Sequence, residues 1–255
     1  MKDKISKIVL FCIEMFFSLV LLILSIMFTI ASIHNINMSE DIKDFIDSCS
    51  FEFESNGTYY YSLEVDELDD DTITLNKIND NLYGPPVLGM PGDIFLMPQS
   101  RMEYFPFFSQ FITYLFGGHA GVVSDNKNII EAMGGSSDQS FVYETYTDLF
   151  IEERTVVGLR VNASKEERSQ AALNAKTLIG KRYNYWFILN TKNNYYCSDL
   201  CSRIYGEEFG MEYQIDTNGF HVSIQDLFRS RDTSITFVKY VKDGKTYIYY
   251  LKKTA

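Results

Sequence analysis

The chain has 255 residues, of which 46% are hydrophobic and 15% are aromatic, so it can bury a substantial core and is not a disordered polypeptide. Its 34 acidic and 23 basic residues give a net charge of −11. No basic stripe is present, which argues against a nucleic-acid-binding protein. Four cysteines are too few for a disulfide-rich scaffold.

One long apolar run lies near the N-terminus, at residues 8–33, with Glu14 as its single charge. About 20 apolar residues are enough to cross the core of a bilayer. Lysines precede the run and acidic residues follow it, so the positive-inside rule predicts a cytoplasmic N-terminus, with the chain after His34 outside. We expect an uncleaved single-pass signal anchor. A signal peptide cleaved after Ala31 is the alternative, although the apolar run is longer than usual for one.

Residues 35–85 form an acidic segment, with 13 acidic residues and two lysines. Its densest part, residues 64–71, lacks the glycine and terminal glutamate of an EF-hand loop, which favours a solvated acidic surface over a calcium site. Alternating segments on both sides of Asn56-Gly57 predict a hairpin. The sequence thus predicts three parts: a cytoplasmic tip and anchor at 1–34, this juxtamembrane segment at 35–85, and a folded domain at 86–255.

The predicted domain mixes strands and helices, which indicates the α+β class. A capping box at Ser164 and Glu167 starts a helix that ends at Gly180, and a second helix starts near Cys197 and ends near Gly206. A hairpin around Asp243-Gly244 closes the chain. Strands are expected at residues 93–97, 120–123, 128–132, 155–161, 235–241 and 246–251.

Two side chains on neighbouring predicted strands could form an acid–base pair. His119 opens one strand, and Glu131 lies near the end of the next, so the hairpin brings them together. A carboxylate beside an imidazole fixes its tautomer and raises its basicity. A salt bridge at the strand ends is the equally simple alternative.

Cys197 lies at the predicted start of a helix. Unpaired N–H groups and the positive end of the helix dipole stabilise a thiolate there, and the same N–H groups could bind an oxyanion. Taken alone, a cysteine among aromatic residues is more often an inert core residue. The sequence also leaves open a disulfide between Cys49 and Cys201.

Several motifs occur in a specific order along the chain: Pro91-Gly-Asp-Ile-Phe-Leu96, Gly118-His-Ala-Gly-Val-Val123, Ile130-Glu-Ala132, Leu159-Arg-Val161, Gly180-Lys-Arg-Tyr183 and Tyr196-Cys-Ser-Asp-Leu200. This order resembles the circularly permuted papain-like amidases, the YaeF/YiiX-like and YebB-like branch of the NlpC superfamily, over roughly residues 86–230. The resemblance implies a permuted papain-like (NlpC-like) fold, an antiparallel sheet with packed helices, in the domain at 86–255, preceded by the transmembrane helix.

The resemblance also implies site residues. The family's cysteine, histidine and acidic partner match Cys197, His119 and Glu131, and its Gly-Asp strand start and its tyrosine after the helix match Asp93 and Tyr183. The family usually has glutamate after Cys-Ser, where this chain has Asp199. Residue chemistry adds Tyr195 and Tyr196 as candidate oxyanion donors.

These residues predict an extracytoplasmic cysteine hydrolase of the cell envelope, an amidase or peptidase that works through a thioester without metal or other cofactor. Cell-wall peptide and lipid amides or esters, the latter as in lecithin–retinol acyltransferase-like relatives, are the competing substrates. Phe107, Phe108 and Phe111 belong to an aromatic segment that could bind an acyl chain, or simply pack on the core. The alternative from another class is a non-catalytic binding module.

Overall fold

The computed structural model describes residues 2–66, 75–79, 82–98, 118–125, 127–135, 140–152, 155–187, 191, 193–213, 215 and 222–253. In chain order the elements are α1 (Lys2–Ser48), β1 (Ser50–Ser55), β2 (Thr58–Val65), β3 (Leu75–Asn79), β4 (Leu82–Pro86), β5 (Ile94–Met97), β6 (His119–Asp125), β7 (Asn128–Met133), β8 (Phe141–Tyr146), α3 (Thr147–Ile151), β9 (Val156–Val161), α4 (Lys165–Thr177), β10 (Arg182–Tyr183), β11 (Asn194–Tyr195), α5 (Cys197–Arg203), η1 (Glu207–Phe209), α6 (Ile224–Arg229), β12 (Thr233–Lys242) and β13 (Lys245–Lys253).

Most of the described strands form one sheet, in the order β1-β2-β13-β12-β9-β5-β6-β7-β8-β10-β11, while β3 and β4 pair separately. The centre of the large sheet is antiparallel. Two pairs toward its ends, β2 with β13 and β10 with β11, are parallel. The predicted α+β class with a long N-terminal helix is therefore confirmed, with a mixed sheet where we expected an antiparallel one.

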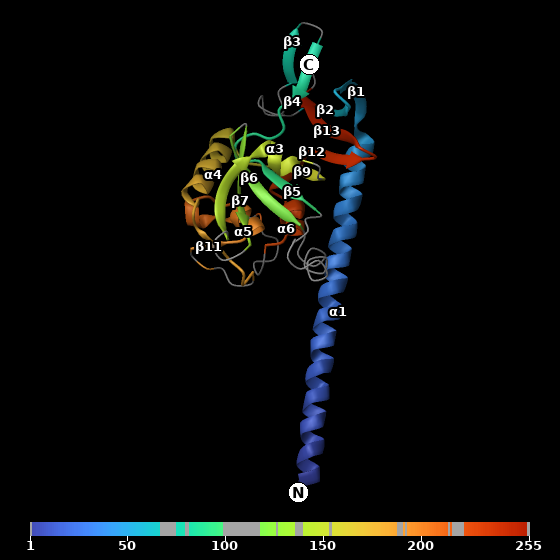
Figure 1. The fold of residues 1–255 in the computed structure, drawn as a ribbon, viewed down its shortest axis with the longest axis vertical. Helices are drawn as coiled ribbons and strands as arrows, with labels where there is room; N and C mark the ends of the chain where they lie inside the picture. The colour runs from blue at the N-terminus through green and yellow to red at the C-terminus, as the bar shows by residue number, and fades with distance from the viewer. Residues whose placement is uncertain are drawn as a thin grey trace.

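The sheet buries both of its faces, because successive side chains along a strand point to opposite sides. One face packs against α4, α5, α6 and the last turns of α1, through residues such as Leu96, Val122, Ala175 and Leu200. The other face holds Phe95 and Phe237 and is covered by Phe150 of α3. Figure 1 shows these helices beside the central strands, with α1 running along one side of the domain.

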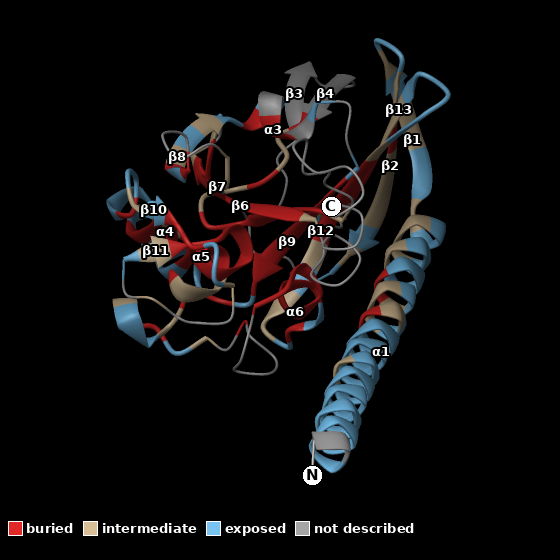
Figure 2. Ribbon diagram, turned by 60° about the horizontal axis from the view of Figure 1, so that its bottom comes forward, coloured by how far each residue is buried: buried red, intermediate tan, exposed pale blue. Residues whose placement is uncertain are grey.

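The helix α1 is longer than the predicted membrane segment. It continues without a break past His34 to Ser48, and Met38, Ile42 and Phe45 pack on the domain at helical spacing. Its apolar stretch is long enough to cross a membrane and is not buried by the rest of the protein. Figure 2 shows this exposed part of the helix extending away from the buried sheet. A continuous helix thus connects the candidate membrane span to the domain.

The strongest local signals in the sequence formed the predicted structures. Ser164 and Glu167 make a complete capping box at the start of α4. The turns at Asn56-Gly57 and Asp243-Gly244 have the positive φ values that a tight hairpin turn requires, and the strands on each side are paired.

The predicted juxtamembrane segment shares the sheet of the C-terminal domain. Its hairpin, β1 with β2, joins that sheet because β2 pairs in parallel with β13 from Thr58 to Val65. The three-part division of the chain remains a prediction. Most of the acidic run at residues 64–71 lies outside the described residues.

Candidate active site

His119 and Glu131 meet on one face of the β6–β7 hairpin. Gly121 lies directly opposite Glu131, and His119 is two residues before Gly121, so it points to the same side. Gly121 has no side chain between the two, and the Glu131 carboxylate bonds Nε2 of His119. Phe150 lies against the imidazole, with ring centroids 5.6 Å apart. The pair is therefore held in a buried, partly apolar setting.

Cys197 is the first residue of α5, and Tyr196 before it has the extended backbone of an N-cap. The thiol hydrogen-bonds His119 and receives the backbone N–H groups of Ala120 and Ser198. Because Nε2 of His119 is taken by Glu131, Nδ1 is the ring nitrogen that is left for the thiol. The histidine thus lies between a carboxylate and a thiol, and the three side chains are hydrogen-bonded in the order Glu131, His119, Cys197.

The pKa values of this pair move in the directions that favour charge separation. Burial raises the pKa of Cys197, but the hydrogen bond and positive charge of His119, together with the two N–H groups, lower it overall. Burial lowers the pKa of His119, but its bonds to Cys197 and Glu131 raise it to about 10. Both shifts favour a thiolate beside an imidazolium, the charged form in which a cysteine can act as a nucleophile.

The other cysteines lack this activation. Burial, with a smaller contribution from the charges of Cys197 and Asp199, raises the pKa of Cys201 well above its usual value. Burial also raises the pKa of Cys49 to about 11. All four cysteines are free, so the disulfide between Cys49 and Cys201 that the sequence left open is not formed.

The three candidate tyrosines have different surroundings. Burial, and then the charge of Cys197, raise the pKa of Tyr183 well above its usual value, so its phenol stays protonated near the thiol. The Tyr196 hydroxyl accepts the N–H of Val222 at 2.9 Å. The Tyr195 hydroxyl instead donates to Glu208 at 3.2 Å, and the ring lies against the Arg203 guanidinium. Tyr183 is thus a better candidate donor than Tyr195, whose hydroxyl is directed to Glu208.

Asp93 has an ion-pair partner that the sequence did not reveal. Both of its carboxylate oxygens accept from Arg160, at 2.9 and 2.8 Å, and one also accepts the N–H of Met90 at 2.8 Å. Gly92 before it has φ +90°, and a Cβ there would lie 2.3 Å from the carbonyl oxygen of Arg168. Asp93 therefore anchors the turn that leads into β5, next to the strand that carries His119.

Asp199 is a further residue that shapes the site. Its carboxylate accepts the N–H of Tyr196, so it caps the start of α5, and it pairs with Arg203 at 3.4 Å. Burial raises the pKa of Asp199 to about 6, although the positive charge of Arg203 acts to lower it. The i, i+4 spacing of Asp199 and Arg203 in the sequence is the signal that could have predicted this ion pair.

Some predicted features lie elsewhere. The acyl-chain candidates Phe107, Phe108 and Phe111 are outside the described residues. Within the described part of the chain, no group of three or more histidine, cysteine and carboxylate side chains is placed to hold a metal ion.

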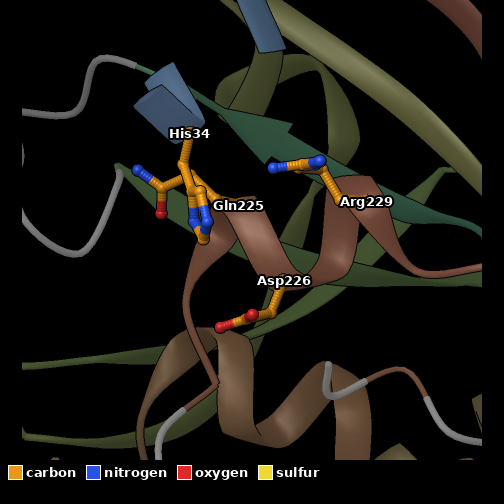
Figure 3. A pocket seen from close by; sticks show the side chains of 4 residues that line it. All are labelled: His34, Gln225, Asp226 and Arg229. Carbon is orange, nitrogen blue, oxygen red and sulfur yellow. The ribbon is translucent and has the colours of Figure 1, made fainter. Parts of the chain in front are cut away.

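A cleft of about 240 Å³ opens between α1 and α6. It is lined by His34, Gln225, Asp226 and Arg229 and by none of the three site residues (Figure 3).

Comparison with known proteins places this site in a family. The chain matches the permuted papain-like amidase enzymes, the YaeF/YiiX or C92 family, over residues 90–242, which is more than half of its length. It belongs to this family. The matched region includes His119, Glu131 and Cys197, and the resemblance inferred from the sequence motifs is confirmed.

Among solved structures, the chain is similar to the crystal structure of the metalloprotein yiiX from Escherichia coli O157:H7. The identity is 21%, and the match covers 60% of this chain and 98% of that chain, with a TM-score of 0.46. No curated protein gives a significant match.

Proposed function

We propose that this protein is a membrane-anchored cysteine hydrolase of the amidase or peptidase type, with Cys197 as nucleophile. One observation supports this most directly: His119 lies between the Glu131 carboxylate and a thiol whose pKa is lowered. Membership of an amidase family agrees with it. A structural salt bridge would need only His119 and Glu131, whereas this arrangement also activates a cysteine at the start of a helix.

The reaction starts from the charged pair. The Cys197 thiolate attacks the acyl carbon of an amide, and the carbonyl oxygen becomes an oxyanion. The imidazolium of His119 gives its proton to the leaving amine, which leaves a thioester on Cys197. Neutral His119 then takes a proton from water, the resulting hydroxide attacks the thioester, and the acid and the thiolate are released. Glu131 holds the imidazole and stabilises its charged form.

Backbone N–H groups are the first candidates for the oxyanion hole. The N–H groups of Ser198 and Ala120 already point at the sulfur, and the oxyanion forms on the carbon atom that becomes bonded to that sulfur. The Tyr196 and Tyr183 hydroxyls are candidate side-chain donors. Removing one oxyanion donor costs on the order of 10²–10³ in kcat in other hydrolases.

We further propose that residues 8–33 anchor the protein in a membrane and that the hydrolase domain faces the extracytoplasmic side. Lysines before the apolar stretch and acidic residues after it support this orientation. Peptide amides of the cell wall are then the most accessible substrates.

A lipid-directed hydrolase or acyltransferase is the second candidate. One feature of the structure favours it: α1 packs directly on α6, which in turn contacts the helix that carries Cys197. If α1 is the anchor, this packing would hold the site near the bilayer surface, where lipid amides and esters are concentrated.

Substrate assays on the full-length protein in detergent test the proposal. Purified cell wall and N-acyl phospholipids are offered in parallel, products are identified by mass spectrometry, and Cys197→Ala serves as the matched control. We expect new amine and carboxyl ends from one substrate with the wild type only. No cleavage of either substrate, or equal cleavage by Cys197→Ala, would contradict the proposal.

A further inference from the structure

The cleft between α1 and α6 lies at a specific height along the anchor. Its α1 residue, His34, is the first polar side chain after the apolar run that ends at Ile33. A residue in that position lies at the boundary between acyl chains and headgroups when the run crosses a bilayer. The cleft is therefore at the level of lipid headgroups, provided that α1 is the membrane anchor of the proposed function.

One side chain in this cleft has an unmet hydrogen bond. Gln225 is only 2% exposed, and its Nε2 donates to Asn35 of α1 at 2.8 Å. Its Oε1 is buried and accepts no hydrogen bond. A buried amide oxygen without a donor is costly, so a ligand group that donates a hydrogen bond to this atom would be stabilised here.

The lining of the cleft combines a cationic side chain with hydrogen-bond acceptors. Arg229 of α6 is exposed and forms no ion pair with any other described residue, and His34 of α1 lines the same cleft. The acceptors are Oε1 of Gln225 and the carboxylate of Asp226, which accepts the N–H and the hydroxyl of Ser223 at 2.8 and 2.6 Å. Figure 3 shows the Gln225 amide beside His34, and the Arg229 guanidinium on the same side of α6.

The cleft, of about 240 Å³, is smaller than sites for drug-sized ligands, which start at about 300 Å³. It has room for a compact polar group and not for a wall peptide. An arginine fork fits a phosphate, and the acceptors beside it fit a hydroxyl or ammonium donor attached to that phosphate. Glycerophospholipid headgroups that end in glycerol or ethanolamine have this combination.

We propose that this cleft is a lipid site that binds the phosphate of a membrane glycerophospholipid through Arg229 and His34, and its terminal hydroxyl or ammonium through Gln225. A bound headgroup connects α1 with α6 and fixes the domain against the membrane surface. Since α6 contacts α5, the lipid site sets how the reactive cysteine faces the bilayer.

Thermal unfolding of the full-length protein in maltoside micelles tests this. The probes are dihexanoyl phosphatidylglycerol, dihexanoyl phosphatidylethanolamine, dihexanoyl phosphatidylcholine and inorganic phosphate, each titrated separately. The first two should raise Tm by about 3–6 °C at ten times the dissociation constant. Phosphatidylcholine has no terminal donor for Gln225 and should give a smaller shift, and inorganic phosphate should give none.

Variants connect the shift to the cleft. Arg229→Gln should abolish it and Arg229→Lys should weaken it, because lysine keeps the charge and loses the fork. Arg231→Gln, an exposed arginine outside the cleft, is the matched control and should keep the full shift. Both replaced arginines are exposed, so the variants should fold. His34→Gln should independently reduce the lipid-induced shift in Tm.

Three results would overturn the lipid site: no shift with any lipid, an equal shift with inorganic phosphate, or a full shift in Arg229→Gln. Alkylation of Cys197 in the wild type is measured on the same preparation. Fast alkylation without a lipid shift would reject the lipid site and leave the proposed hydrolase intact, while slow alkylation would reject the hydrolase.

Discussion

The first and second turns of α5 carry the same residue type on the same side of the helix, with opposite outcomes. Cys197 begins the first turn and Cys201 lies one turn later, and both are at most 9% exposed. The pKa of Cys197 is lowered, whereas that of Cys201 is raised well above its usual value. Position along one short helix therefore decides which thiol has a lowered pKa.

The comparison separates burial from activation. Burial is the largest influence on both thiols, and it raises both pKa values. Only Cys197 has a cationic partner, His119, and the N–H groups of Ser198 and Ala120. A thiol without such partners remains a small core residue. The buried environment does not lower a thiol pKa by itself; the partners at the helix start do.

The largest effect is expected from removing the proposed nucleophile. Cys197→Ala should lower the rate of amide hydrolysis by about 10³-fold or more, because no thioester can form. The comparison requires that Cys201 cannot substitute for it. Measured kcat of the variant within tenfold of the wild type would show that the thiol of Cys197 is not the nucleophile.

Replacement of the proposed base, His119, should have the next largest effect. His119→Ala should reduce kcat/KM by about 10²–10⁴-fold, the usual contribution of general acid–base catalysis. It should also make Cys197 behave more like Cys201, since only burial and the N–H groups then act on its pKa. Steady-state kinetics and thiol titration check the two effects, and circular dichroism shows whether the fold is intact. An unchanged Cys197 pKa would contradict the pairing.

A smaller effect is expected from the orienting carboxylate. Glu131→Gln keeps a hydrogen bond to His119 and loses the negative charge, so the pKa of His119 should fall from about 10. We expect kcat/KM to drop by about 10-fold, toward the lower end of the range for acid–base groups. The high-pH limb of the rate profile should move to lower pH. If the high-pH limb stays in place, it reports the titration of a group other than His119.

The smallest effect on activity is expected from the second turn. Cys201→Ala should leave kcat within about twofold, and the lost sulfur should cost about 1 kcal/mol of unfolding free energy in this fully buried position. Denaturant unfolding and kinetics on the same sample separate the two. A hundredfold loss of activity with unchanged stability would show that Cys201 also takes part in the reaction, and would contradict the distinction between the two cysteines.

Local signals made much of the fold predictable. The capping box at Ser164, the turn at Asn56-Gly57 and the turn at Asp243-Gly244 each depend on a few neighbouring residues, and each formed as expected. The contact between His119 and Glu131 was also predictable from local sequence, because one hairpin brings the two residues together.

Long-range pairings could not be derived in the same way. The parallel pairing of β2 with β13 joins segments nearly 190 residues apart, and no single residue indicates it. The partner of Asp93, Arg160, lies 67 residues away on β9. The sequence also gave no reason for α1 to continue past the predicted membrane boundary, because Met38, Ile42 and Phe45 reveal their role only once α6 and the sheet are packed beside them.

Alkylation of the full-length protein by iodoacetamide between pH 5 and 9, with each modified cysteine quantified by mass spectrometry, tests the central claim most directly. The thiolate of Cys197 is lost only when pH falls through its lowered pKa, so this residue should react fastest and remain reactive well below the ~8.5 of a free thiol. Cys49 and Cys201 should react slowly over the whole range, and His119→Ala should slow Cys197 at low pH. Equal rates for Cys197 and Cys49, unaffected by His119→Ala, would contradict the account.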